Sequence, residues 1–443
     1  MDAGYISIII LVVAMVFYIT ELLPIPVVAL SSAAAMAIFK VLPGNEAWAS
    51  LATDTVLIMA GITLVGSTLF HTGAATLMAE KLINYTGGKP KITILIMLGV
   101  SGAMSSLLSN TTSTILFLPL ILSVVAKAND ESIYEQKYMQ MLTLMTSVGG
   151  LITLVGSPVN IAGSGMLKAS GFDPFTFTQF TKIAIPMYIV SLAYVFTVGD
   201  KIAEKIFGKN PKHSDFVEDF IKKELNAEGK EKELSPKEGN LLKKKQITSV
   251  IILIITIVGF LTQKSHGLSL GTTAIIGGLA CVITKCVTVK EMYQKIDWGT
   301  IFLLAGTIGA ATGLAKSGGG QIIADFFVHI VGGSINPMTV FISLSLASAV
   351  LTQFMSNTGT VSMLIPIGVS IAAGLGMDPL PIAMGITLTA SCSFLTPMAS
   401  PTQAMIMNWG SYKFNDYLKY SGPISLVLNI MILVLVPMFF PLT

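Results

Sequence analysis

The chain has no arginine and little charge of either sign. Charged residues make up 12% of its 443 residues, and all 27 basic residues are lysines. An arginine guanidinium holds a carboxylate or a phosphate through two parallel hydrogen bonds, so this mode of anion binding is excluded. We expect no nucleic-acid partner, and an anionic ligand must be held by other groups.

Cysteine is scarce as well. Cys281, Cys286 and Cys392 lie in or beside apolar runs, and their spacing matches neither a disulfide framework nor a metal-binding pattern. We therefore interpret all three as small core residues.

Nothing in the sequence resembles a nucleophile paired with a base. The four histidines, His71, His213, His266 and His329, fall in predicted loops far from the polar segments described below. This absence argues against a membrane enzyme, and a receptor has no positive feature in its favour.

Ionisable side chains are missing from the long apolar segments. The nearest acids, Glu21 and Asp54, lie at predicted helix ends. Proton coupling at membrane depth normally uses Asp, Glu or His, so their absence disfavours a sodium/proton antiporter. The segments without any Asp, Glu, Lys or His are 92–126, 139–167, 338–377 and 379–408.

What the chain has is apolar sequence, with 53% hydrophobic residues. Runs of membrane-spanning length recur along it and predict an all-α, polytopic membrane protein. No lysine precedes the first run, so we expect a membrane helix there and not a cleaved signal peptide. The predicted unbroken helices are 5–22, 25–41, 54–70, 183–199, 247–263, 269–285, 300–315 and 421–441.

An internal repeat divides the chain into halves. The tripeptide Ser-Asn-Thr occurs at 109–111 and at 356–358, each time with a proline ten residues after the serine. Glycine, proline, lysine and acidic positions match between the halves, so chance matching of apolar sequence is a poor explanation. Matched positions include Lys40 with Lys285, Glu46 with Glu291, Gly73 with Gly318, and Gly156-Ser157-Pro158 with Ala399-Ser400-Pro401.

Each half has an apolar stretch that contains the tripeptide, at about 92–126 and 338–377. A stretch broken at Ser-Pro follows it, at about 139–167 and 380–408. The stretch 92–126 is too short for two spans of about 20 residues each, so we predict re-entrant hairpins with the tripeptides at their tips. Each half then crosses five times, and an odd number inverts the second half relative to the first.

Lysine placement predicts the orientation. With both termini outside, most lysines fall on the inner side of a cell inner (plasma) membrane. The predicted domains are a first repeat, 1–199, a cytoplasmic linker, 200–246, and a second repeat, 247–443. The linker is the only long polar stretch of the chain.

The polar groups of the broken segments are hydroxyls, amides and backbone. Hydroxyl and carbonyl oxygens suit a hard monovalent cation such as Na⁺, and the N-termini of half-helices suit a carboxylate or another oxyanion. Neutral residues can therefore bind an anion and a cation together, which links the two thermodynamically.

The paired Ser-Asn-Thr tips, each followed by a Ser-Pro break, resemble the divalent anion–sodium symporter family, which transports dicarboxylates, citrate or sulfate. The resemblance covers nearly the whole chain. It implies a scaffold domain and a transport domain, elevator-like movement, a homodimer in lipid, and one substrate held between two sodium sites.

The resemblance assigns site residues by motif position. It implies sodium ligands at Ser105, Ser109, Asn110, Gly156, Thr352, Met355, Asn357 and Ala399. It implies contacts with the anion at Asn110, Thr111, Ser157, Asn357, Thr358, Ser400 and Pro401.

The sequence thus predicts sodium-coupled import of a divalent anion, with a C4-dicarboxylate such as succinate, malate or fumarate as the leading substrate. A sodium-independent dicarboxylate exchanger and a sodium/proton antiporter are the alternatives. The family's breaks usually read Ser/Thr-Pro-Pro-Asn, whereas this chain has Val159 and Thr402 for the second proline and Gln403 for the second asparagine.

Overall fold

The computed structural model describes residues 2–20, 22–74, 77, 90–128, 133–208, 236–331, 336–397 and 400–443, and over these residues its regular elements are all helices. The helices of the first half are α1 (Ala3–Thr20), α2 (Ile25–Ile38), α3 (Gly44–Ala49), η1 (Ser50–Ala52), α4 (Asp54–His71), α6 (Pro90–Ser105), α7 (Asn110–Lys127), α8 (Glu135–Gly149), α9 (Pro158–Ala169), α10 (Thr181–Phe196) and α11 (Val198–Phe207). Those of the second half are α13 (Pro236–Leu261), α14 (Gln263–His266), α15 (Leu270–Ile283), α16 (Val289–Lys295), α17 (Trp298–Lys316), α18 (Gly319–Val331), α19 (Pro337–Leu351), α20 (Asn357–Gly374), α21 (Pro379–Ser391), α22 (Pro401–Trp409) and α23 (Phe414–Phe439).

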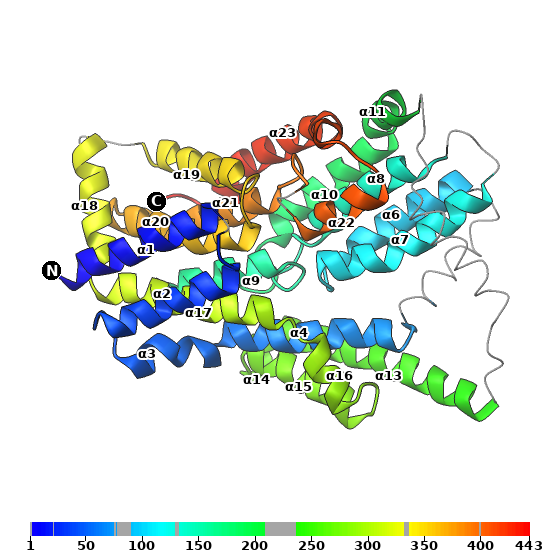
Figure 1. Cartoon of the computed structure of the whole chain (residues 1–443), viewed down its shortest axis with the longest axis horizontal. Coiled ribbons are helices and arrows are strands. Elements are labelled where there is room, and N and C mark those ends of the chain that lie inside the picture. Colours follow the sequence, from blue (N-terminus) through cyan, green and yellow to red (C-terminus); the bar gives the residue numbers. More distant parts are fainter. Residues whose placement is uncertain are drawn as a thin grey trace.

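The helices form two layers along the long axis of the molecule (Figure 1). One layer contains α2, α3, α4 and α13 to α17, in which α4 packs on α15 and α2 on α17. The other contains the two broken segments of each half, with α6 and α7 packed on α8 and with α19 and α20 packed on α21. The layers meet where α9 of the second layer contacts both α4 and α17 of the first.

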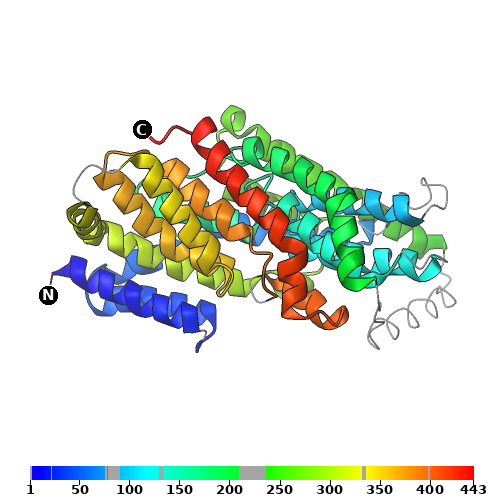
Figure 2. The same cartoon turned by 90° about the horizontal axis from the view of Figure 1, so that it is seen from above.

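Two helical hairpins enter from opposite ends of the long axis. The pair α6 and α7 lies toward one end, and the pair α19 and α20 lies toward the other, with their turns directed to the middle (Figures 1 and 2). Both chain termini lie toward the end occupied by α19, whereas α11 ends and α13 begins toward the other end.

Equivalent glycines of the two halves make equivalent close contacts with a helix of the other half. A Cβ atom built on Gly61 of α4 would lie 2.3 Å from the backbone of Ala274 on α15. A Cβ atom built on Gly306 of α17 would lie 2.2 Å from the backbone of Ala29 on α2. Gly61 and Gly306 are 245 positions apart, and so are Ala29 and Ala274. Such reciprocal contacts are what a two-fold relation between the halves produces.

The backbone repeats in the same register. Lys40 and Lys285 both have φ of 58°, in the left-handed region, at the residue after the C-caps of α2 and α15. Gly73 and Gly318 have φ of 72° and 75° just after α4 and α17. A left-handed residue is costly for lysine and common at a helix C-terminus, so its recurrence reflects a shared chain path.

Two side-chain contacts between the halves are also reciprocal. Lys316 Nζ lies 2.7 Å from Glu46 Oε2, and His71 Nε2 lies 3.2 Å from Glu291 Oε1. Each pair fastens a short helix, α3 or α16, to the last residue of the long helix from the other half. The two long helices α4 and α17 are therefore held at their C-terminal ends in the same way.

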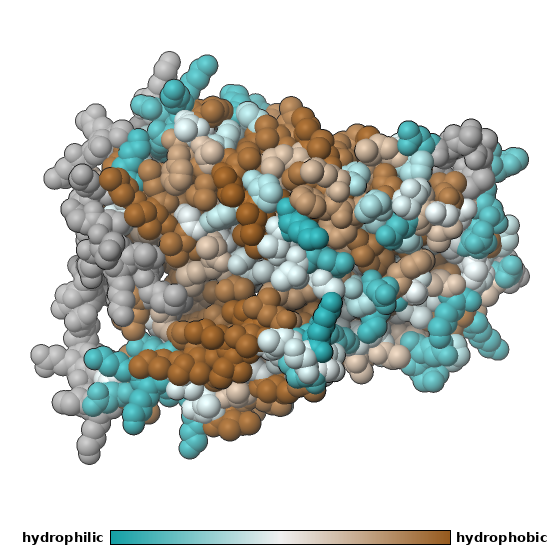
Figure 3. All heavy atoms as spheres, turned by 180° about the vertical axis from the view of Figure 1, so that it is seen from behind, coloured by the Kyte–Doolittle hydropathy of each residue, from teal (hydrophilic) through white to brown (hydrophobic). Residues whose placement is uncertain are grey.

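The helices have the length and surface of membrane spans. In the described part of the chain, six helices are long and apolar enough to cross a membrane, and the pair α10 and α11, bent by 47°, makes a seventh candidate. Hydrophobic side chains cover broad areas of the face in Figure 3, and residues such as Ile38 and Ile283 are 73% and 77% exposed. An exposed apolar surface of this extent fits contact with lipid.

Several elements differ from the sequence predictions. The helices predicted at 25–41 and 269–285 are 14 residues each in the structure. Helix α18 was not predicted, and the prediction of loop histidines was wrong for His71 and His266, which end α4 and α14, and for His329 within α18.

Lys137 is another difference, because it falls between the predicted stretches 92–126 and 139–167 and is predicted to lie in an inner loop. The structure has it in the first turn of α8, only 1% exposed, with Nζ 2.6 Å from Asp200 Oδ1 on α11. A buried lysine requires such a partner, and the pair joins the start of α8 to the end of the first half.

Candidate functional site

Four helices begin at the polar breaks. Asn110 and Asn357 are the first residues of α7 and α20, with Ser109 and Ser356 as their N-caps. The Oγ of Ser109 accepts a hydrogen bond from the Thr112 N–H at 3.2 Å. The Ser356 Oγ accepts the corresponding bond at 3.4 Å. These serine caps explain why the chain turns at each tripeptide and restarts as a helix.

The other two helices start at the Ser-Pro sequences. Pro158 and Pro401 are the first residues of α9 and α22, where proline is tolerated because its missing N–H would have no helical partner. Ser157 accepts a hydrogen bond from the Val159 N–H at 3.3 Å. Ser400 makes no cap bond, and its Oγ lies 2.8 Å from Thr402 Oγ1.

Backbone oxygens converge beside the first hairpin turn. A Cβ atom built on Gly156 would lie 2.6 Å from the Gly150 carbonyl oxygen. The same point is 2.8 Å from the Ser106 carbonyl oxygen and 3.0 Å from that of Ser105. On Gly150, a Cβ atom would meet Asn110 Oδ1 at 1.8 Å. Uncharged oxygens of five residues thus surround one small region. We call these residues the first cradle: Ser105, Ser106, Asn110, Gly150 and Gly156.

Hydrogen bonds fix the first cradle. Ser105 Oγ donates to Asn110 Oδ1 at 3.0 Å. The amide nitrogen of Asn160, on α9, donates to the carbonyl oxygens of Gly150 at 3.3 Å and Thr153 at 2.8 Å. Asn160 is fully buried, so the loop between α8 and α9 is held by its own helix.

The second hairpin turn has a matching cluster. Thr352 Oγ1 lies 2.8 Å from Asn357 Oδ1 and 2.7 Å from the Ala390 carbonyl oxygen. Thr396 Oγ1 donates to the Gln353 carbonyl oxygen at 2.6 Å. We call Thr352, Asn357 and Ala390 the second cradle.

The second cradle lacks the asparagine brace. Gln403 stands where the first half has Asn160, and its Oε1 accepts a hydrogen bond from Thr143 of α8 at 3.3 Å. Its Nε2 is buried and has no partner among the described residues. The loop before α22 is therefore not held by its own helix in the way that the loop before α9 is.

The two halves pack into each other around these helix starts. Helix α9 packs on α20, and α22 packs on α7 and α8. A Cβ atom on Gly163 of α9 would lie 2.3 Å from Thr387 Oγ1 of α21, which shows how closely the halves approach. Each hairpin arm thus contacts the broken helix of the other half.

The other layer reaches the first hairpin turn through α4. A cavity of about 20 Å³ lies between α4, the turn and the break before α9. Such a volume holds a single water molecule. Its polar lining comes from Thr63 and Ser67 of α4 and from Ser109 and Thr112 of the turn.

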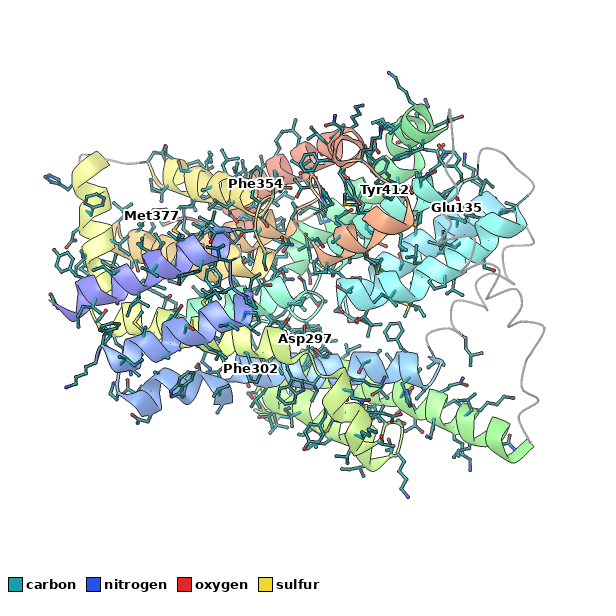
Figure 4. The ribbon with its side chains drawn as sticks, viewed as in Figure 1. Glu135, Asp297, Phe302, Phe354, Met377 and Tyr412 are labelled. Atoms are coloured by element: carbon teal, nitrogen blue, oxygen red, sulfur yellow. The ribbon has the colours of Figure 1, made fainter. Side chains whose placement is uncertain are left out.

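The remaining predicted residues lie on the same breaks. Thr111 is half-buried in the first turn of α7, and Thr358 is buried in that of α20. Met355 is buried in the second hairpin turn, beside Phe354, whose side chain is 67% exposed (Figure 4). Ala399 lies outside the described residues.

Sequence reasoning missed several oxygens of the cradles. Ser106, Gly150 and Ala390 contribute backbone carbonyl groups, which leave no side-chain signal. Two features of the sequence could have indicated these loops: the pair Gly149-Gly150, and the threonine that recurs as Thr153 and Thr396.

The arrangement suits ion binding and not covalent chemistry. Among the described residues, no three His, Cys, Asp or Glu side chains come together. Both cradles consist of hydroxyl, amide and carbonyl oxygens, and four helix N-termini adjoin them. In a multi-pass helical membrane protein, a centre of this composition can bind small ions.

The chain belongs to the citrate transporter family, whose model matches residues 15–342 and 315–442. This match confirms the resemblance to the divalent anion–sodium symporters. Among its relatives is an uncharacterized transporter of Haemophilus influenzae, 24% identical over 434 residues, with 94% of this chain and 88% of the relative covered. The sodium-dependent dicarboxylate transporter SdcS of Staphylococcus saprophyticus is 23% identical over 449 residues, with 96% and 83% covered.

Solved structures share the fold. The YdaH transporter of Alcanivorax borkumensis matches with a TM-score of 0.56 at 14% identity, over 90% of this chain and 87% of that chain. MtrF of Neisseria gonorrhoeae matches with a TM-score of 0.57 at 16% identity, over 90% and 84%. The relatives are transporters, and the protein is a multi-pass membrane transporter and not an enzyme.

Proposed function

We propose that this protein imports a divalent anion, with a C4-dicarboxylate as the leading substrate, together with sodium ions. The observation that carries the proposal is the pair of uncharged oxygen cradles, one at each hairpin turn. The relative SdcS, named as a sodium-dependent dicarboxylate transporter, supports the same substrate and ion.

The cradles supply the cation sites. At the first, Asn110 Oδ1 and the carbonyl oxygens of Ser105, Ser106, Gly150 and Gly156 can replace the water shell of a sodium ion. At the second, Asn357 Oδ1 and the oxygens of Thr352 and Ala390 do the same, with Met355 and Ala399 as further backbone ligands by family resemblance.

The anion is held by backbone dipoles. The helices that start at Asn110, Pro158, Asn357 and Pro401 have free N–H groups and partial positive charge at these ends. Thr111, Ser157, Thr358 and Ser400 add hydroxyl groups. Two bound sodium ions offset the charge of a dianion where no arginine or lysine is present.

The architecture supports movement across the membrane. We propose that the halves are inverted repeats, that the hairpins are re-entrant, and that 200–246 is cytoplasmic with both termini outside. The layer of α2, α4, α15 and α17 acts as the scaffold, and the layer with the hairpins moves against it as an elevator in a homodimer. The reciprocal contacts of Gly61 and Gly306 support this symmetry.

Uptake into proteoliposomes tests the function. Labelled succinate, citrate and sulfate are offered with an inward sodium gradient, with potassium in its place, or with a pH gradient alone. We expect succinate to accumulate only with sodium. Full accumulation without sodium but with succinate inside would favour the dicarboxylate exchanger, and accumulation driven by pH alone would favour proton coupling.

Cysteine labelling tests the orientation. The native Cys281, Cys286 and Cys392 are buried, so they give little background. A Lys230→Cys variant should react with an impermeant maleimide only after the cells are permeabilised. Reaction in intact cells would place the linker outside and contradict the inverted topology.

A further inference from the structure

A buried hydroxyl lies beside the second hairpin turn. Ser393 is 1% exposed, and its Oγ has no hydrogen-bond partner among the described residues. Native proteins rarely leave a buried hydroxyl without a partner, because its desolvation is then not offset. The Ser393 hydroxyl is therefore free to bind a ligand.

Ser393 lies in the segment that holds this turn. Upstream of it, the Ala390 carbonyl oxygen accepts a hydrogen bond from Thr352. Downstream, the Leu395 N–H donates to Gln353 Oε1 at 3.2 Å, and Thr396 Oγ1 donates to the Gln353 carbonyl oxygen. Both ends of the segment thus contact residues 352–353, with Ser393 between them.

The first half shows where a side chain at this position points. The bond from Thr396 to Gln353 repeats the bond from Thr153 to the Ser106 carbonyl oxygen, which fixes the register of the two loops. In this register Ser393 corresponds to Gly150.

A side chain on Gly150 would enter the first cradle. Its Cβ atom would lie 1.8 Å from Asn110 Oδ1 and 2.9 Å from the Gly156 carbonyl oxygen. By the same register, we expect the side chain of Ser393 to face the second cradle. A hydroxyl at this position of the repeat has no counterpart in the first half, where a side chain on Gly150 would collide with Asn110.

The second cradle also has more acceptors than donors. The hydroxyl of Thr352 has one hydrogen, yet both Asn357 Oδ1 and the Ala390 carbonyl oxygen lie within 2.8 Å of its oxygen. At least one of these acceptors is left without that hydrogen. A surplus of uncharged oxygens is what a hard cation needs.

We propose that the Ser393 hydroxyl is a ligand of the second sodium ion, beside Asn357 and Thr352. The inference rests on the proposed sodium coupling. The two cation sites then differ in one respect: the loop before the broken helix contributes only backbone oxygens to the first site, and it adds a side-chain hydroxyl to the second.

Thermal unfolding of the purified protein tests the proposal without any transport. Sodium chloride is titrated against choline chloride at constant ionic strength, and the sodium concentration that half-occupies the site, its Kd, is fitted to the logarithmic rise in Tm. We expect Ser393→Ala to raise this concentration about tenfold, because one ligand oxygen is lost. Ser393→Cys keeps the side-chain shape with a slightly larger atom, replaces the hard oxygen by sulfur, and should have the same effect.

Ser345→Ala is the matched control. Ser345 on α19 is fully buried and its Oγ also lacks a partner among the described residues, but it lies within an unbroken helix. Its sodium response should equal that of the wild type. A normal sodium response of Ser393→Cys, or an equal loss in Ser345→Ala, would overturn the assignment. Absence of any sodium effect on the wild type would instead contradict the proposed function.

Discussion

The two helix breaks have the same plan but different supports. In the first, Asn160 of α9 donates to carbonyl groups of its own loop, so the break is closed on itself. In the second, Gln403 is one methylene longer and reaches Thr143 of α8 instead. The asparagine of the first break therefore supports its own segment, whereas the glutamine of the second break bonds to a neighbouring helix of the other half. A repeated fold can thus keep two sites alike in chemistry and make them unequal in rigidity.

The largest expected effect comes from the residues that the two breaks share. Asn110→Ala and Asn357→Ala should each lower sodium-coupled uptake about a hundredfold, because each removes an oxygen acceptor of a cradle and two donors. Expression and folding should be retained, as judged by gel filtration. Ser343→Ala on the exposed face of α19 is the control and should transport normally. Near wild-type uptake by either asparagine variant would show that the tripeptides only break the helices.

The next test exchanges the residues that make the cradles unequal. Gly150→Ser places a Cβ atom 1.8 Å from the present position of Asn110 Oδ1, so the first cradle has to distort. We expect at least a tenfold loss of sodium affinity from this variant. Sodium titration of Tm measures it, and unchanged affinity would mean that Gly150 does not border a cation site.

Contacts between the long helices should respond equally in the two halves. Gly61→Ala and Gly306→Ala each place a methyl group against the backbone of a partner helix. Each should lower the free energy of unfolding by about 1–3 kcal/mol through overpacking. Chemical unfolding in detergent compares them. A large effect at only one of the two positions would contradict the reciprocal packing.

A smaller effect separates the two supports. Asn160→Ala removes two buried hydrogen bonds and should cost about 1–3 kcal/mol. Gln403→Ala removes one long bond and should cost about 1 kcal/mol or less. The difference in Tm between these variants, with and without sodium, checks the asymmetry. Equal losses would show that both breaks are supported to the same degree.

The smallest effect concerns Glu291, which pairs with His71 on the surface. Hydrogen bonds from the Thr288 N–H, at 2.7 Å, and from the Thr288 hydroxyl hold the pKa of this carboxyl below its usual range. A lowered folded-state pKa stabilises the protein above the unfolded pKa and loses this contribution as pH falls through the folded value. Glu291→Gln should therefore lower the free energy of unfolding at pH 7 by about 1 kcal/mol or less, which is measured as a small decrease in Tm.

The pH dependence of Glu291→Gln gives its check. The difference in Tm from the wild type should shrink when both are measured in acid, where the wild-type carboxyl becomes protonated. Glu46→Gln, which affects the reciprocal pair with Lys316, is the matched variant. A difference for Glu291→Gln that persists unchanged at pH 3 would mean that charge is not involved.

Much of the fold followed from the sequence because its signals are local. Ser-Asn-Thr and Ser-Pro end one helix and start the next, and helices α7, α9, α20 and α22 begin there in the structure. Ser105 with Asn110, and Thr352 with Asn357, were predicted to share sites and do lie within hydrogen-bond distance. Their roles with ions stay predictions.

What the sequence could not supply depends on contacts between distant segments. The carbonyl oxygens of Gly150 and Ala390 belong to the backbone, so no residue type announces them. The burial of Lys137 is decided by Asp200, which the fold brings to it from another helix. Helix α18 follows α17 after a short turn at Gly318, and its apolar stretch is too short to stand out as a span.

The proposed recognition of the anion by helix N-termini has a consequence for how the protein tolerates mutation. A backbone N–H is present whatever the side chain is. Single substitutions at Thr111 or Thr358 should therefore lower the affinity for the substrate without abolishing binding. Only proline removes an N–H, and Pro158 and Pro401 already stand where none is needed. We therefore expect substitutions of the hydroxyl residues to change the preference among anions gradually, while the backbone donors stay the same. Relatives with other residues at these positions would keep an affinity for carboxylates and differ in their preference among them.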